Sequence, residues 1–353
     1  MVRYNYYMKN KYLIRMAISM VGAVILFMFV VNNSWMYKSP VAKVLAVHNN
    51  GNKQSIELRL ENGSDKGKTV YVKNKYDKSQ VYDERYFKHD YVFLNDEYTG
   101  ITGIKRDYWV AAIFLFLLSS LITVGGKRGT CTSLCILGNI ALFGIIIYMN
   151  MRGVDILYMT IAGTVVFTFF VLLVVDGLSH RMMLSFAAAL LTTLLLSSLV
   201  MLLIWHTDID YDFLHFLPEP FTTTDANHFF LAQIIIGCLG AVIDVSVTIT
   251  AACMELIERT PSISNKSLLR SVREVADDIN GTMISVVLLT NIASTLPIFL
   301  ISMSNEISFR TVVSHDAYFY IVRSLTGMLS IVVAILVSTF ITSLVARKEL
   351  KHD

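Results

Sequence analysis

The residue best suited to chemistry is Asp244, an ionisable side chain inside the otherwise apolar stretch 229–254. A carboxylate at mid-bilayer costs about 3 kcal/mol on insertion scales, so such a residue is a functional-site hypothesis by default. It stands about 15 positions into the stretch, which is roughly 22 Å at the helical rise of 1.5 Å per residue. We therefore expect Asp244 to face protein or water, as an ion or proton site on a translocation path.

Small and polar residues surround Asp244 at spacings of three and four, which places them on one helix face. They are Gly237, Gly240, Ala241, Thr248, Ala251 and Glu255. Small residues let another helix approach closely, so Asp244 as a protonated member of a packing seam remains an open alternative. Glu255 lies three turns further along the same face, where it is either a relay toward the inner exit or an ordinary interfacial residue.

The following apolar stretches add candidate ligands and packing residues. Pro297 predicts a kink that frees a backbone carbonyl, and Asn291 and Thr295 beside it supply further oxygens for a hard cation or polar solute. An ordinary kinked helix is the alternative. We expect Gly281 and Gly327 to pack against neighbouring helices, and Arg323 to lie too shallow in its span to pair directly with Asp244.

These residues require membrane helices to position them. Only 16% of the 353 residues are charged, against roughly 25% in soluble domains. Long uncharged or nearly uncharged runs occur at 16–37, 109–126, 129–151, 156–175, 182–205, 229–254, 279–305 and 324–346. Because a span needs about 20 apolar residues, the pattern predicts an all-α polytopic membrane protein with about eight transmembrane helices.

The distribution of Lys and Arg predicts the orientation. With the N-terminus inside, the short outer loops between later spans carry only Arg152 and Arg310, which satisfies the positive-inside rule with both termini cytoplasmic. The first run exceeds the length of a signal-peptide core and lacks a cleavage site, so we interpret it as an uncleaved anchor.

Residues 38–107 differ from the rest, because short alternating apolar stretches are separated by turn clusters. They predict a small extracytoplasmic β domain, barrel-like and of the OB or SH3 kind. Its mixed charges and its lack of a stacking pair argue against nucleic acid and favour a structural or partner-binding module. The expected domains are thus 1–37 (cytoplasmic N-terminus and anchor), 38–107 (β domain) and 108–353 (seven-helix core with cytoplasmic C-terminus).

The remaining motifs predict no enzyme, no cofactor and no metal centre. The segment 125–130 reads GGKRGT, which lacks the phosphate-loop spacing, and no nucleophile elbow or zinc-protease motif occurs. Asp277 lies too near the membrane edge to form a protease-like aspartate pair with Asp244. Cys131 and Cys135 share a helix face without partner ligands and are expected to pack. The acidic loop 206–228 outlines an EF-hand, but Phe213 occupies the position that needs Gly; it either concentrates divalent cations at an entrance or simply lacks basic residues.

The segment 237–261, GCLGAVIDVSVTITAACMELIERTP, and DDINGTM at 277–283 resemble the YibE/F-like family of bacterial multi-span proteins, specifically its longer member type. The resemblance covers most of 108–345. It implies a plasma-membrane protein of permease type, often in company with a shorter relative that lacks the soluble domain, and no known substrate. Val275 and Ala276 stand where more basic character is expected, which weakens anion binding there.

Our hypothesis is a secondary permease or permease subunit for an ion or small polar solute, with a core built from the last three spans. Asp244 is the expected binding or coupling carboxylate. The alternative is a non-transporting assembly or sensing protein whose outer domain binds a partner. A permease requires a water-accessible cavity at Asp244. In a scaffold, the small and polar residues on the same helix face as Asp244 would pack against another helix and exclude water.

Overall fold

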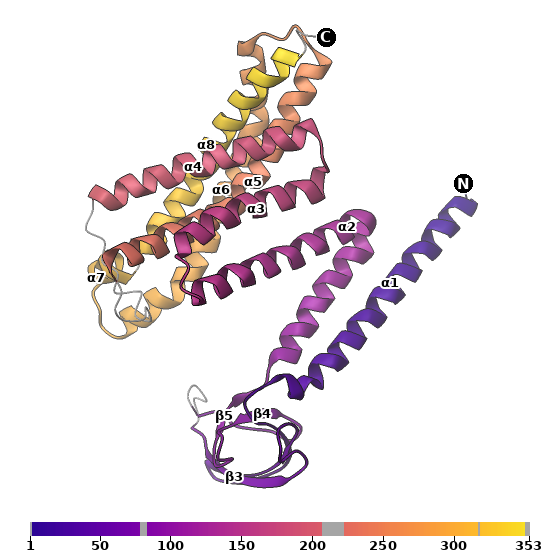
Figure 1. Ribbon diagram of the computed structural model, residues 1–353, viewed down its shortest axis with the longest axis vertical. Helices are drawn as coiled ribbons and strands as arrows, with labels where there is room; N and C mark the ends of the chain where they lie inside the picture. Colours follow the sequence, from indigo (N-terminus) through magenta and orange to yellow (C-terminus); the bar gives the residue numbers. More distant parts are fainter. Residues whose placement is uncertain (1, 78–82, 207–221, 317, 350–353) are drawn as a thin grey trace. The chain divides into compact units, whose positions relative to one another are not determined.

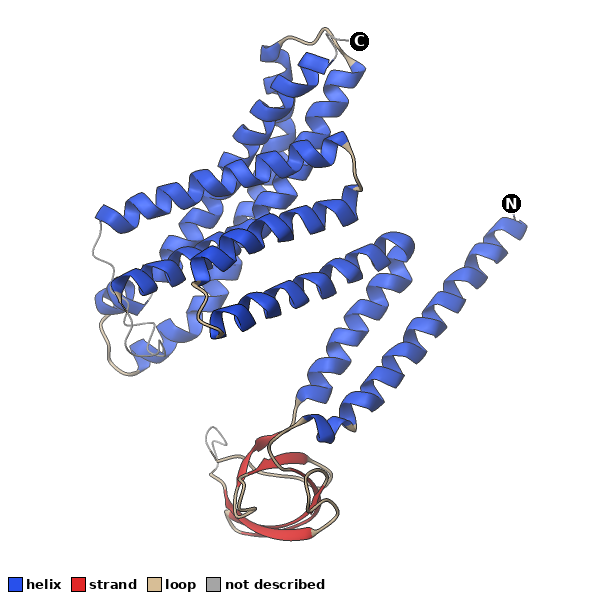
Figure 2. Ribbon diagram, in the orientation of Figure 1, coloured by secondary structure: helices blue, strands red, loops and turns tan. Residues whose placement is uncertain are grey.

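The computed structural model describes residues 2–77, 83–206, 222–316 and 318–349. The chain forms two compact units, Met1–Ser133 and Leu134–Asp353. They divide within one long helix rather than at the end of the β domain. Figure 2 shows that the strands are confined to one small region and that the remaining elements are helices.

The β domain of the first unit contains five strands. They are β1 (Val41–Asn50), β2 (Lys53–Leu60), β3 (Thr69–Lys75), β4 (Tyr91–Leu94) and β5 (Ile101–Ile104). All described pairs are antiparallel, in the order β3-β2-β1-β4-β5. Asn50 pairs with Lys53 across a two-residue hairpin loop, where Gly51 adopts the positive φ of 59° that such turns require. The sheet curls around its interior (Figure 1).

The core of the β domain follows from strand alternation. In β2, every second residue from Gln54 to Leu60 is buried, because side chains alternate between the two faces of a strand. Ile56 and Leu58 pack there with Val44 and Val92 from neighbouring strands. The buried Gln54 is fully used, since its amide donates to the Tyr86 carbonyl at 3.0 Å and its oxygen accepts from the Tyr86 amide at 3.0 Å. The short alternating stretches that were predicted within 38–107 are therefore present, as strands β1 to β4.

Helices precede and follow the β domain within the first unit. α1 (Val2–Val31) contains the apolar segment Met16–Val31, and a short 3-10 turn, η1 (Asn33–Met36), leads to the sheet. α2 (Asp107–Met151) has 45 residues and includes the non-helical Gly126, with φ 56° and ψ −122°. A Cβ on Gly129 would lie 1.8 Å from the Leu121 carbonyl oxygen. Residues eight apart in a straight helix are about 12 Å apart, so the chain turns back on itself here.

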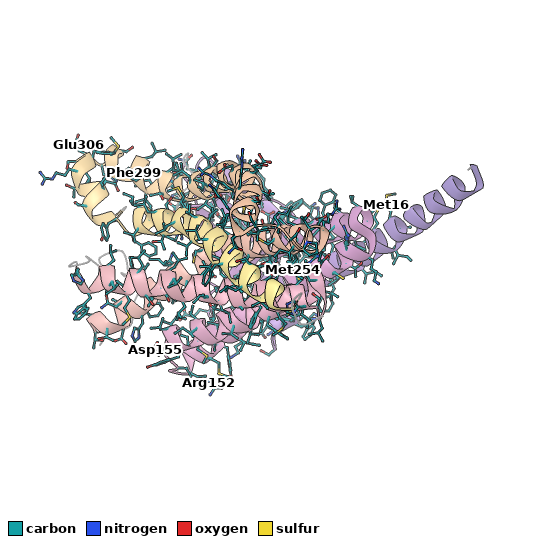
Figure 3. The ribbon with its side chains drawn as sticks, turned by 90° about the horizontal axis from the view of Figure 1, so that it is seen from above. Met16, Arg152, Asp155, Met254, Phe299 and Glu306 are labelled. Carbon is teal, nitrogen blue, oxygen red and sulfur yellow. The ribbon has the colours of Figure 1, made fainter. Side chains whose placement is uncertain are left out.

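The second unit is helical. After the end of α2 come α3 (Ile156–Asp176), α4 (His180–His206), α5 (Thr223–Arg259), α6 (Asn265–Ser304), the single turn α7 (Phe309–Thr311), the π-helical turn η3 (Val312–Asp316) and α8 (Tyr318–Glu349). The side chains of Phe299 and Glu306 mark the end of α6, and those of Arg152 and Asp155 mark the connection from α2 to α3 (Figure 3).

Six described helices, α2 to α6 and α8, are long and apolar enough to cross a membrane. α2 is too long for one span, because 45 residues of helix measure about 68 Å. The prediction of a polytopic helical membrane protein is confirmed at this level. The main hydrophobic core joins α5, α6 and α8 with Ala189 and Leu196 of α4.

Candidate functional site

Asp244 lines a cavity of about 430 Å³ in the second unit. The walls come from the second arm of α2 through Asn139, from α3 through Phe167 and Val171, and from α5 itself. Asp244 is exposed on this wall. Among the described residues, no Lys, Arg or His forms an ion pair with its carboxylate. The carboxylate is therefore available to an ion, a proton or a solute.

Asn139 supplies the second polar group of this cavity. Its side-chain oxygen Oδ1 is buried, and no described group donates a hydrogen bond to it. Together with the Asp244 carboxylate it gives the cavity two oxygen acceptors among apolar walls, which is the ligand chemistry of a hard cation. The sequence argument missed Asn139, because an uncharged amide in the run 129–151 is a weaker signal than a carboxylate.

The position of Asp244 on α5 follows from the two faces of that helix. Val242, Val245 and Ile249 are fully buried in the main core, and their helical spacing turns the opposite face, with Gly240 and Asp244, outward. A Cβ on Gly240 would meet no atom within 4 Å. The described chain therefore does not close the small-residue stripe against another of its own helices at this level.

Other members of the predicted stripe have local partners. The Thr248 hydroxyl donates to the Asp244 backbone carbonyl at 2.9 Å and is exposed. A Cβ on Gly237 would lie 3.5 Å from the Arg323 side chain. Ala241 packs at the edge of the main core. Glu255 is exposed and forms an ion pair with Arg259 at 2.6 Å. An ordinary residue of the membrane interface would form such a pair, so this contact does not require Glu255 to act as a relay.

Asn291 and Thr295 lie apart from the Asp244 cavity. They line a groove of about 300 Å³ between α6 and α8. The Arg323 Nε donates to the Asn291 side-chain oxygen at 2.9 Å, and the Thr295 hydroxyl donates to the Asn291 carbonyl at 2.7 Å. The oxygen that we expected to bind a cation thus already holds a guanidinium group, which lies 5.6 Å from the Tyr320 ring centre.

A third cavity, of about 680 Å³, lies between α6 and α8 and includes Asp277 and Asn280 of the DDINGTM segment. The Asn280 oxygen Oδ1 is buried without a described partner. Gly281 would meet nothing within 4 Å if it carried a Cβ, so its predicted packing role has no partner in the described chain. Gly327 is different, because its Cβ would lie 3.1 Å from Val287 and thus marks a close contact of α6 with α8.

The acidic loop falls mostly outside the described residues, including its Asp208, Asp210, Asp212, His215 and Glu219. At its far end, His228 pairs with Asp155 at 2.6 Å, and Asp225 closes the capping box that starts α5. Among the residues that the structure describes, no group of three His, Cys, Asp or Glu side chains could hold a metal ion.

The helices and the curled sheet define the class of protein: a multi-span helical membrane protein with a small antiparallel β domain. Residues 112–348 match the family described as YibE/F-like protein, and residues 35–106 match the YibE/F family N-terminal domain. The chain belongs to the YibE/F-like family, as the motifs in α5 and α6 indicated. No curated protein and no solved structure matches it.

Proposed function

We propose that this protein is a secondary permease, or one subunit of a permease, that moves an ion or small polar solute across the plasma membrane. The observation that carries the proposal is the Asp244 carboxylate in the wall of a cavity within the helical unit, where no described residue forms an ion pair with it. Contact of a charged carboxylate with lipid at this depth would cost about 3 kcal/mol. Water or a solute in the cavity removes that cost.

The proposal includes a topology of eight spans. They are the apolar part of α1, the two arms of α2 on either side of Gly126, and α3, α4, α5, α6 and α8. Both termini are then cytoplasmic and residues 38–107 extracytoplasmic, in agreement with the positive-inside rule. The strand order β3-β2-β1-β4-β5 favours an OB-type barrel for that domain.

Asp244 and Asn139 are the proposed binding groups, and Thr248 is the next polar group along α5. Glu255 marks the inner end of the same face. Asn291 has a different role in this proposal, because it positions Arg323 rather than binding the solute. The second subunit in this proposal is a shorter relative of the family.

Cysteine accessibility tests whether water reaches the cavity. In a variant whose four native cysteines are replaced by alanine, Asp244→Cys is expected to react with a membrane-impermeant, positively charged methanethiosulfonate from one side of the membrane. Val245→Cys is fully buried on the opposite face of α5, and Leu194→Cys lies on an exposed apolar face of α4. Both controls are expected to stay unreactive, because the reagent and the thiolate avoid apolar surroundings.

A lack of reaction at position 244 in both right-side-out and inverted vesicles would contradict the permease proposal.

A flux measurement is the second test. Proteoliposomes loaded with a pH-sensitive dye are expected to show potential-driven proton entry for the wild-type protein and for Glu306→Gln, which lies outside the cavity. Asp244→Asn cannot carry the proton and is expected to match empty liposomes. Equal flux in Asp244→Asn and the wild-type protein would remove Asp244 from the mechanism.

The second candidate function is assembly without transport. One observation favours it, because the space beside Gly240 is open and small residues promote close helix contact. In that case a helix of another subunit covers the stripe and Asp244 is a protonated hydrogen-bonding group. Disulfide formation by Thr248→Cys between chains, together with an unreactive position 244, is the result that would favour assembly over transport.

A further inference from the structure

A further cavity, of about 310 Å³, lies on the β domain at the start of α2. It is lined by Glu84, Arg85, Phe87, Asp90, Arg106 and Trp109, which we call the interface pocket. A water molecule occupies about 30 Å³, so the pocket has room for a ligand considerably larger than one water. It belongs entirely to the first unit and shares no residue with the Asp244 cavity.

Arg85 is the group in this pocket whose hydrogen bonding is incomplete. Its guanidinium group lies 5.4 Å from the ring centres of both Tyr76 and Phe87. These contacts fix its plane. Its Nε is buried, and no described group accepts a hydrogen bond from it. A buried N–H of a cation normally has an acceptor, and a phosphate oxygen is a strong one for arginine.

The charges around Arg85 indicate a zwitterionic ligand. Arg106 pairs with Glu84 at 2.6 Å, and Asp90 accepts from the Phe87 amide with only one of its two oxygens. Two arginines and two carboxylates leave the pocket without net charge. A purely anionic ligand would face the two carboxylates, whereas a ligand with a phosphate and an ammonium group has a partner for each sign of charge.

The position of the pocket matches the headgroup layer of a membrane. Trp109 is the third residue of α2, so it lies about 5 Å from the start of that apolar helix, and it is 60% exposed. Trp35, in the turn that follows α1, is 69% exposed. Exposed Trp side chains at the ends of apolar helices are typical of the membrane interface, a layer about 5 to 8 Å thick on each side.

We propose that the interface pocket binds the headgroup of a phospholipid that carries a primary ammonium, that is, a phosphoethanolamine group. The phosphate accepts hydrogen bonds from the guanidinium groups of Arg85 and Arg106, both of which line the pocket. The ammonium group donates to Glu84 and Asp90. The glycerol and acyl chains follow the exposed faces of Phe87 and Trp109 toward the membrane. This site is independent of the permease proposal, because it shares no residue with the Asp244 cavity.

Native mass spectrometry of the full chain tests the proposal. Protein purified in detergent and stripped of lipid is titrated with phosphatidylethanolamine or with phosphatidylglycerol of the same acyl chains. We expect preferential retention of phosphatidylethanolamine, and about a fivefold loss of that retention in Arg85→Gln, because one charge-assisted hydrogen bond to phosphate is removed. Arg59→Gln is the control: this arginine of β2 pairs with Glu61 outside the pocket, and retention should stay within about twofold of the wild-type value.

Three results would overturn the proposal. The first is equal retention in Arg85→Gln and Arg59→Gln. The second is retention of phosphatidylglycerol equal to or above that of phosphatidylethanolamine in the wild-type protein, a comparison that holds even if Arg85→Gln does not fold. The third is binding of soluble phosphoethanolamine as tight as that of the lipid, since loss of the acyl chains should weaken binding by about tenfold or more.

Discussion

The buried Lys105 provides the sharpest stability prediction. Its side chain is fully buried, and its Nζ lies 2.9 Å from an Asp107 carboxylate oxygen and donates to the Val30 carbonyl at 2.9 Å. The rings of Tyr37, Tyr91 and Tyr108 surround it, with centres 5.7, 5.9 and 5.8 Å from Nζ. One ammonium group therefore connects the end of α1, the β domain and the start of α2.

Replacing Lys105 by Met keeps most of the side-chain volume and removes the charge. The Asp107 carboxylate then loses its cation, and breaking a buried ion pair from one side costs about 3 to 5 kcal/mol. We expect the lower figure, about 3 kcal/mol, because the Asp107 side chain is 29% exposed and water partly compensates. Tyr37 still donates to the other carboxylate oxygen at 2.6 Å.

Hydrogen exchange of the full chain in detergent micelles measures this loss. A change of about 3 kcal/mol corresponds to roughly a hundredfold faster exchange, which we expect in the segments 30–38 and 103–110. Lys68→Met is the control, since Lys68 forms an exposed pair with Asp65 and should change nothing measurable. The double variant Lys105→Met with Asp107→Asn should recover part of the loss, because no uncompensated charge remains. Equal exchange in Lys105→Met and Lys68→Met would refute the reasoning.

Three further predictions concern the turn in α2, the α6 to α8 contact and the β domain. Gly126→Val forces a β-branched residue into positive φ and should cost about 2 kcal/mol or more; loss of monodisperse protein in gel filtration, with Gly144→Ala unchanged, checks it. Gly327→Leu overpacks against Val287 and should lower the unfolding free energy by about 1 to 3 kcal/mol; thermal unfolding of the single chain should show no comparable loss for Gly240→Leu. Burial, with the nearby Glu84 charge, raises the pKa of Tyr86 above its usual 10.0. The unfolded chain therefore releases this proton first, so that stability falls as the pH rises above about 10, and Tyr86→Phe should reduce this fall in melting curves taken between pH 9 and 11.

The β domain shows what local patterns predict well. Alternation in β2 and the turn at Gly51 are visible in the sequence, because strand faces and tight turns depend on neighbouring residues. Strand β5, only four residues with Gly103 inside, was not among the predicted segments. The glycines and charges at 125–130 separate two apolar runs in the sequence, and the non-helical Gly126 lies in this segment. That the chain remains helical up to a single non-helical Gly126 depends on the close approach at Gly129, which no local pattern reveals.

The candidate site was predicted only in part, for a physical reason. A charge in an apolar stretch is a signal in one dimension, so Asp244 could be found, and the helical period separates its face from that of Val245. The cavity partner Asn139 comes from a helix about 100 positions away. The sequence of neither segment predicts that these two helices lie side by side. For the same reason the bond from Arg323 to Asn291 was not predicted, and Asn291 was grouped with Asp244.

The Lys105 cluster also has a mechanical consequence. The Lys105 ammonium group joins the last turn of α1 to the Asp107 carboxylate at the start of α2. The sheet and these two helix ends are therefore connected by buried, charge-assisted bonds as well as by the backbone. A load applied to the sheet, such as a bound molecule that tilts it, is transmitted to both helix ends together. We therefore expect the β domain and the two helix ends to move as one body.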